Sequence, residues 1–434
     1  MRGSSPSRRG RPRAPAPIPR PAPGRGLALA AALALAAAAP LAAQEAGGLD
    51  EAALFEGAAF DTAVAESAAP GGAAAPEFLA GGTVLVRAAA AGPASLEGYS
   101  ASSSAQARLF AKASLPDYGA FYAAFNVKQA FLAAGSGGLA PSPAPDLAEP
   151  SVTLSELHWS FDLGKVLFLR LGDQLVAWGP SRIWTPVDFV NREKADAFSS
   201  VDLRAGKPGL RLHLPLPSAN AFFFADFSGS VEGGAAQDLG ESLAYAARLD
   251  ATLAEAEFGL SGWAGARVQD KLGFDFSGRL FGASVYGEAA WAPAYDSGER
   301  SLAASLGLSR ALGDLKRWTL GAEFFYNSAG ADRTGQYVAP PPDWYAPLYL
   351  GEYYGYASLQ AKELFSPSLA TSLSVLANLS ELSYTVKASE SFDFPRSLPF
   401  TLSLSYSGGG AGKEFTWASG DDSLALSFEV RAEF

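Results

Sequence analysis

The chain is organised by a two-residue alternation of apolar and polar side chains that begins near Gly81 and continues to Phe434. In the last segment the apolar set is Leu424, Leu426, Phe428, Val430, Ala432 and Phe434, and the set between them is Ser423, Ala425, Ser427, Glu429, Arg431 and Glu433. Side chains two positions apart share one face of a β-strand, so such a segment has an apolar face and a polar face. The same pattern recurs at 210–216, 369–378 and 398–407. Alternation of this kind predicts an all-β protein.

Such strands fit either a soluble β-sandwich, which buries its apolar faces in a core, or a barrel with lipid outside and water inside. Three features favour the barrel. Several segments run for ten or more residues, whereas soluble strands usually have about five or six and a membrane strand needs about 9–11. Charged residues such as Glu429 and Arg431 lie within the polar face, and aromatic residues gather at strand ends, as at 159–161, 223–227 and 353–356.

Segments bounded by turn-forming residues number about eighteen, and bacterial barrels have an even number of strands. We therefore predict a closed antiparallel transmembrane β-barrel of about 16–18 strands with a short N-terminal periplasmic tail. A barrel of this size leaves an aqueous channel instead of a filled core. The longer connections at 135–150, 179–208 and 329–347 are expected to be extracellular loops.

The N-terminus has the order of a secretory signal peptide. Residues 1–25 contain seven Arg and no acidic residue, an apolar run follows at 27–39, and small residues precede Gln44. A membrane anchor is the alternative, but the apolar run is shorter than the about 20 residues that span a bilayer. The predicted organisation is a cleaved signal peptide at 1–43, a flexible periplasmic tail at 44–78 and an outer-membrane barrel at 79–434.

Composition narrows the chemistry further. Seven of the 33 basic residues lie in the leader, so 26 remain against 44 acidic ones, a net charge of −18 that argues against nucleic acid as a partner. The chain has no Cys and only two His, which argues against disulfides, a thiol nucleophile and a metal site, and no cofactor is expected. Glu156, His158 and Ser160 share a strand face, but a hydrolase triad normally draws on several segments, so an enzyme is not expected.

One segment carries a specific motif. An Arg-x-Gly-x-Gln strand ends in Trp-Gly and is followed by Pro-x-Asp, at residues Arg170, Gly172, Gln174, Trp178, Gly179, Pro186, Asp188 and Asn191. This motif resembles that of a group of poorly characterised bacterial outer-membrane β-barrel proteins and, more loosely, alginate-export-type and phosphate-selective-type porins. The segments 209–212 and 214–216 also match the group, whereas Ser181 and Thr185 depart from it. The resemblance covers about fifty residues and implies a channel or export role without naming a solute.

The predicted function is an outer-membrane porin-like channel for passive or weakly selective passage of small polar or anionic solutes. The alternative is a surface or assembly barrel, an adhesin or polysaccharide-export component, without an open pore. The loop after this strand is a candidate pore constriction, because charges at a constriction set selectivity. The candidate pore-lining residues are Arg170, Gln174, Trp178, Arg182, Trp184, Asp188, Asn191 and Arg192. The two Trp rings are candidates for stacking on sugars, and a purely structural ion network of Arg170, Asp188 and Arg192 is the competing interpretation.

The C-terminal Phe434, together with Phe428 and Val430, resembles the membrane-insertion signal of outer-membrane barrels. The expected partners are outer-membrane lipid, the barrel-assembly machinery and small polar solutes, and a homo-oligomer is a further candidate. The expected localisation is the outer membrane.

Overall fold

The structure is a computed structural model, and it describes residues 76–96, 98–133, 149–191, 203–231, 243–265, 268, 270–293, 301–313, 317–332, 349–364, 366–394, 398–416 and 419–434. The predicted signal peptide and nearly all of the predicted tail lie outside the described residues. Strand β1 begins at Glu77, so it includes Glu77 and Phe78, which the sequence analysis assigned to the tail. Within the described residues no helix has both the length and the apolar character needed to cross a membrane.

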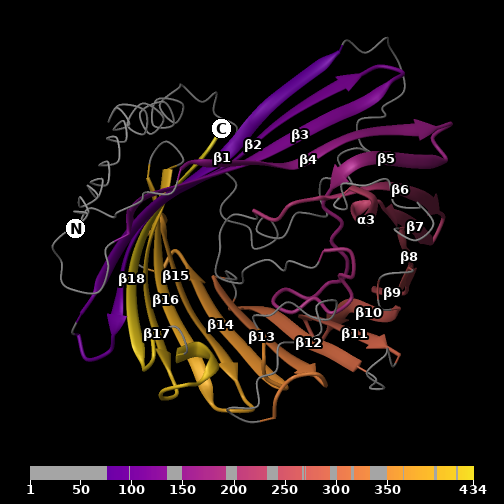
Figure 1. The fold of residues 1–434 in the computed structure, drawn as a ribbon. Coiled ribbons are helices and arrows are strands. Elements are labelled where there is room, and N and C mark those ends of the chain that lie inside the picture. Colours follow the sequence, from indigo (N-terminus) through magenta and orange to yellow (C-terminus); the bar gives the residue numbers. More distant parts are fainter. Residues whose placement is uncertain are drawn as a thin grey trace, which may run out of the picture. The chain divides into compact units, whose positions relative to one another are not determined.

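Eighteen strands form one closed antiparallel sheet, which confirms the predicted barrel (Figure 1). Each strand pairs with the next along the chain, and β18 pairs with β1, so the sheet has no free edge. The strands are β1 Glu77–Pro93, β2 Ser100–Leu115, β3 Gly119–Ala133, β4 Ser151–Leu163, β5 Leu167–Gln174, β6 Lys207–Leu216, β7 Ala219–Asp226, β8 Ala244–Leu253, β9 Ala256–Gly265, β10 Lys271–Leu280, β11 Ala283–Ala292, β12 Ser301–Leu312, β13 Trp318–Asn327, β14 Tyr353–Lys362, β15 Leu369–Asn378, β16 Ser383–Phe394, β17 Leu398–Gly408 and β18 Ser423–Glu433. Two short helical turns, α3 Ser228–Val231 and η1 Glu414–Thr416, lie in connections.

The connections at the two ends of the barrel differ in length. Strands β6 and β7 are joined by two residues, and so are β10 and β11, where Phe281 and Gly282 both have positive φ, as a tight hairpin turn requires. The connections after β3, β5, β7 and β13 are much longer, and all of them lie at the opposite end. Both chain ends of the barrel lie at the end with the short turns, which outer-membrane barrels place in the periplasm.

The alternation seen in the sequence separates the two faces of the sheet. Leu426 and Phe428 of β18 face outward and are 48% and 43% exposed, while Ser427 between them faces inward. Register shifts occur at Ser103/Ser104 and Ala124/Phe125. The ladder of β5 is continuous through Asp173, which pairs with Leu157 of β4 and Pro208 of β6. Asp173 lies on the outward face of β5, at the end with the long loops.

Some of the aromatic residues at strand ends, which the sequence analysis took as favouring a membrane barrel, lie inside the barrel. Tyr354 and Phe224 are fully buried, and each belongs to an apolar cluster on the inner wall. Phe223, between Phe224 and Phe222, is 37% exposed on the outside. These inward aromatic residues differ from the polar lining expected of a barrel lumen, because a segment of the chain packs against them inside the barrel. The core of this protein therefore lies within the barrel.

Candidate functional site

The connection that leaves β5 lies, in its described first part, inside the barrel and against the inner wall (Figure 1). Its described first part, residues 175–191, is called the inner loop below. It has no regular secondary structure, and it packs on inward-facing residues of strands from β7 to β15. The N–H groups of Asp188 and Phe189 donate to carbonyls within the loop, but a segment without regular structure leaves most of its other N–H groups to find partners on the wall or in water.

Glu288 of β11 supplies one such partner. The backbone N–H groups of Ser181 and Val187 donate to its two carboxylate oxygens, at N···O distances of 2.8 and 3.1 Å. Gly179 passes directly over this carboxylate with a φ of +93°, and a Cβ there would lie 2.2 Å from Oε1. Only glycine fits this close approach. The hydroxyls of Ser181 and Ser305 add a contact of 2.7 Å to β12.

Glu323 of β13 supplies the second anchor. The N–H groups of Arg182, Ile183 and Trp184 donate to its carboxylate oxygens over 2.8 to 3.4 Å. The hydroxyl of Tyr286 donates to Oε2 of the same carboxylate at 3.2 Å. Hydrogen bonds to a charged group contribute about 1.5–3 kcal/mol each, roughly twice the value for neutral pairs. Two wall carboxylates thus hold five backbone amides of the inner loop.

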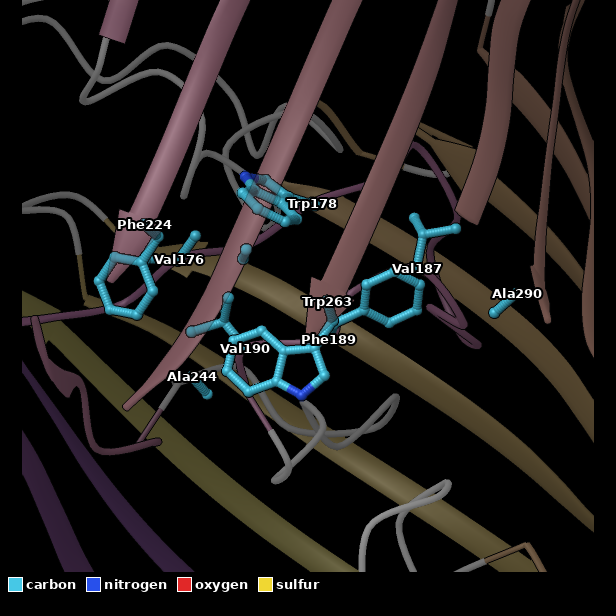
Figure 2. Packing of buried hydrophobic residues seen from close by; sticks show 10 residues of the cluster. Val176, Trp178, Val187, Phe189, Val190, Phe224, Ala244, Trp263 and Ala290 are labelled. Atoms are coloured by element: carbon cyan, nitrogen blue, oxygen red, sulfur yellow. The ribbon is translucent and has the colours of Figure 1, made fainter. Parts of the chain in front are cut away.

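Apolar side chains of the inner loop also pack against apolar residues of the barrel wall, in two clusters. One cluster joins Val176, Trp178, Val187, Phe189 and Val190 of the loop to the wall (Figure 2). The wall side of this cluster is Phe224 of β7, Ala244 and Ala246 of β8, Trp263 of β9 and Ala290 of β11.

The second cluster surrounds Trp184, which is fully buried. Its ring stacks on Phe325 at a centroid distance of 5.5 Å and meets Tyr349 edge-on at 5.7 Å. Protein covers both Trp184 and Trp178. Neither ring offers a face for stacking on a sugar, so that part of the sequence interpretation is wrong.

The two ends of the inner loop are tied together by side chains of the motif. The Asn191 amide donates to the backbone carbonyl of Val176 and, at 3.1 Å, to Asp188 Oδ1. Asp188 also forms an ion pair with Arg204, at 3.5 Å. The predicted pinning network had Arg170 and Arg192 as the partners of Asp188. The structure adds Arg204 as a partner of Asp188, and because Arg192 lies outside the described residues, the predicted network of Arg170, Asp188 and Arg192 stays a prediction.

Arg170 and Gln174 remain on the strand wall. Arg170 Nε donates to the hydroxyl of Ser160 in β4 at 3.1 Å. Gln174 is fully buried, and its Nε2 lies 3.3 Å from the carbonyl oxygen of Gly209 in β6. These two residues join neighbouring strands where the chain leaves β5 for the lumen.

Glu156, His158 and Ser160 of β4 form part of a network of polar contacts on the inner wall of the barrel. His158 Nδ1 lies 3.4 Å from the Ser160 hydroxyl, but its Nε2 lies 3.9 Å from Glu156 Oε2, longer than a hydrogen bond. Glu156 pairs with Arg108 of β2 and accepts the N–H of Leu175 at 3.1 Å. Glu156 is thus a third wall carboxylate that receives a backbone amide of the inner loop.

The inward face of β15–β18 is lined by hydroxyl groups. Ser372, Ser389, Ser403 and Ser427 are paired in register across these four strands. Hydroxyl contacts of 2.8 to 2.9 Å join Ser389 to Ser403, Ser391 to Thr401 and Thr385 to Ser407. Inward charges of the wall occur in opposite pairs, such as Arg87 of β1 with Glu429 of β18 and Arg248 of β8 with Asp275 of β10.

The sequence analysis missed Glu288 and Glu323. Each stands on the inward face of a strand of otherwise small or apolar residues, SVYGEAAWA and TLGAEFFY. A lone acidic residue in such a setting was the available signal. No pattern in the sequence showed that its partners would be backbone amides of a segment about 100 residues or more away.

The C-terminal strand closes the barrel against β1. Phe434 and Gly82 exchange backbone hydrogen bonds of 2.9 and 3.1 Å. Phe428 and Phe434 present 43% and 41% of their surfaces on the outside. Their proposed role in membrane insertion stays a prediction.

Comparison with known proteins supports the fold. No family model and no curated protein matches the sequence. Among solved structures, OpdK of Pseudomonas aeruginosa with vanillate has a TM-score of 0.54 at 10% identity, over 82% of this chain and 100% of that chain. A BenF-like porin of Pseudomonas fluorescens Pf-5 has 0.51 at 10%, over 82% and 98%, and OccAB1 of Acinetobacter baumannii has 0.50 at 9%, over 82% and 97%. The resemblance to alginate-export-type and phosphate-selective-type porins stays a prediction, and what these comparisons establish is the 18-stranded barrel fold.

Proposed function

We propose that the chain is an outer-membrane porin-like channel for passive or weakly selective passage of small polar or anionic solutes. The observation that carries this proposal is the inner loop, which narrows the lumen and is fastened to the wall by Glu288 and Glu323. A barrel of this strand number encloses water, and an inward loop then sets the size and charge of the passage.

The lining supports passage of polar solutes. The hydroxyl rows of β15–β18 can exchange hydrogen bonds with water or with a solute. The paired charges, such as Arg248 with Asp275, limit the net field along the wall. The similar OpdK structure contains vanillate, an aromatic carboxylate, which supports keeping anions in the proposed solute class.

Of the predicted pore residues, Arg182 is the one that we propose acts on solutes. Its guanidinium lines a cavity in the lumen, whereas Trp178, Trp184, Asp188 and Asn191 fix the shape of the inner loop. We further propose that a signal peptide directs export of the chain and is then cleaved. The barrel-assembly machinery would insert the barrel into outer-membrane lipid, with Phe428, Val430 and Phe434 as the insertion signal.

The test is reconstitution of the purified chain into planar lipid bilayers. A porin gives stable unitary conductance steps in KCl and a measurable ion preference in a salt gradient. A surface or assembly barrel with a closed lumen gives no steps, although it still shows the heat-modifiable gel mobility of a folded barrel. That second result would replace the channel proposal with the surface-barrel alternative.

A further inference from the structure

Tyr286 of β11 reaches across β12 to the acidic residue on β13. The three residues Tyr286, Gly307 and Glu323 are paired in register on neighbouring strands, all on the inward face. Two strand spacings separate Tyr286 from Glu323, about 9–10 Å. The Tyr286 side chain spans most of this distance and donates its hydroxyl to Glu323 Oε2 at 3.2 Å.

Gly307 makes this crossing possible. A Cβ at Gly307 would lie 2.3 Å from Cε2, 2.4 Å from Cζ and 2.7 Å from the hydroxyl oxygen of Tyr286. Contacts this short do not occur between real atoms, so any larger residue would push the Tyr286 ring away from the wall. The absence of a side chain at Gly307 therefore allows the Tyr286 ring to lie across β12.

Tyr286 is linked to Arg182 directly through its ring and indirectly through Glu323. The guanidinium carbon of Arg182 lies 5.6 Å from the centroid of the Tyr286 ring, a cation–π distance. The backbone N–H of Arg182 donates at 3.1 Å to Glu323 Oε2, the same oxygen that accepts the Tyr286 hydroxyl. The backbone and the charged end of Arg182 are thus both placed by the Tyr286–Glu323 pair.

Arg182 and Tyr286 line a cavity of about 620 Å³ on the short-turn side of the inner loop. The remaining charged lining is Arg279 of β10, Glu255 of the β8–β9 turn and Glu257 of β9. Thr252, Ser277 and Ser284 add hydroxyls. Arg182 alone among these charges comes from the inner loop, so its position depends on how that loop is held.

We infer that Tyr286, lying over Gly307, is a positioning residue that holds the Arg182 guanidinium at this cavity, and that the charge held there favours anions over cations in the passage. This inference rests on the proposed channel function. It assigns ion preference to the placement of one charge and not to the total charge of the lumen.

The test compares variants by reversal potential in a KCl gradient. Arg182→Gln is expected to lower the chloride-to-potassium permeability ratio by about two- to five-fold, the factor that one unit charge gives at a few ångströms in water. Gly307→Ala keeps the charge but displaces Tyr286, and it is expected to lower the ratio in the same direction. The double variant is expected to match Arg182→Gln alone, since both changes remove the same effect.

Two further variants serve as a milder change at Tyr286 and as a control for the glycine substitution. Tyr286→Phe removes only the hydroxyl, so it should lower the ratio less than Gly307→Ala while leaving the barrel folded. Gly262→Ala is the matched control, because a Cβ there meets its nearest atoms at 3.8 Å and displaces nothing. It should behave as the wild type. Heat-modifiable gel mobility reports that each variant is folded.

The outcomes separate the two proposals. Wild-type channels with an unchanged ratio in both Gly307→Ala and Tyr286→Phe would overturn the positioning role of Tyr286. An unchanged ratio in Arg182→Gln would overturn the role of the charge. In either case the channel function would stand. A wild-type chain that is folded but gives no conductance steps would overturn the channel function and this inference with it.

Discussion

At the scale of single residues, the inner loop depends on carboxylates that face the lumen. Glu288 and Glu323 are 3% exposed, and each accepts backbone N–H groups that the loop cannot satisfy by itself. A buried amide without a partner costs free energy comparable to a lost hydrogen bond. These two side chains therefore decide where the loop lies, although neither belongs to the loop.

Glu323→Gln should loosen the inner loop. The amide keeps one acceptor oxygen but presents its NH₂ group to backbone donors, so some of the hydrogen bonds are lost. We expect a larger and noisier unitary conductance, and a loss of about 2 kcal/mol in the free energy of unfolding. Single-channel recording and urea unfolding in detergent micelles measure the two effects. Glu77→Gln, at an exposed glutamate at the start of β1, is the control, and equal behaviour of both variants would contradict the anchoring role.

Gly259 in β9 has a role like that of Gly307. Arg248 of β8 reaches over it to a two-bonded pair with Asp275 of β10, at 2.6 and 2.9 Å. A Cβ at Gly259 would lie 2.4 Å from Arg248 Nη2 and 2.5 Å from Asp275 Oδ2. Gly259→Ala should therefore break the pair and lower the free energy of unfolding by about 3 kcal/mol. Gly262→Ala in the same strand should change it by less than about 0.5 kcal/mol, and similar losses in both would show that the ion pair is not the cause.

At the scale of elements, the four strands β15–β18 contribute a wall rich in hydroxyl groups. Their inward positions carry hydroxyls in register beside the charged residues Lys387 and Glu429, whereas the inner loop packs on strands from β7 to β15. Short hydroxyl side chains fill little of the lumen and add no net charge. These four strands therefore place a continuous set of hydroxyl groups on one side of the barrel wall.

Ser389→Glu tests whether that wall borders the conducting path. A carboxylate in the middle of the hydroxyl rows should raise cation permeability relative to chloride, opposite in effect to the Arg182 charge. Reversal potentials in a KCl gradient measure the shift, and Ser389→Gln controls for side-chain size. An unchanged potential in Ser389→Glu would mean that ions do not pass along β15–β18.

The loop between β17 and β18 holds two carboxyl groups with opposite pKa shifts. Burial raises the pKa of Glu414 above its usual value, although Glu414 accepts hydrogen bonds from Tyr354, Asn378 and the N–H of Leu350. The hydrogen bond from the Tyr406 hydroxyl lowers the pKa of Asp422, and backbone N–H groups of the loop add to this shift. Both carboxyls lie outside the strands.

These shifts predict opposite dependences of stability on pH. A carboxyl with a raised pKa binds more protons when folded, so the stability that Glu414 contributes falls as the pH rises from about 4.3 through the raised value. The contribution of Asp422 is present above about 3.9 and is lost as the pH falls through the lowered value. Glu414→Gln should remove the first slope and Asp422→Asn the second, as measured by thermal unfolding midpoints from about pH 3 to about pH 8. The same slope in a variant and the wild type would rule out that carboxyl as its source.

At the scale of the whole molecule, the barrel is closed by hydrogen bonds and filled in part by its own loop. Closure pairs every strand on both sides and removes the edges that a sheet of alternating strands would otherwise expose. The inner loop then covers the apolar residues on the inside, so Phe224, Trp263 and Phe325 are buried without contacting lipid. Lumen shape and barrel packing are therefore coupled through this loop.

Much of this architecture could be predicted from the sequence. The strand faces, the long connections and a barrel of 16–18 strands follow from alternation and turn residues, and the structure confirms them. The importance of the segment around Trp178 and Asp188 was also visible as a motif. The function predicted for its side chains was less accurate, because Trp184 and Trp178 turned out to be packing residues.

By itself, the sequence determined the period of two, the two faces and their order along the chain, because these depend only on neighbouring residues. Only the tertiary structure decided that the strands close at eighteen, that the inner loop lies against strands from β7 to β15, and that Glu288 and Glu323 hold it there. Backbone amides are the same in every residue except proline, so the sequence of the inner loop carries no mark of which distant carboxylate will accept them. That choice is made when the barrel brings the strands around the loop.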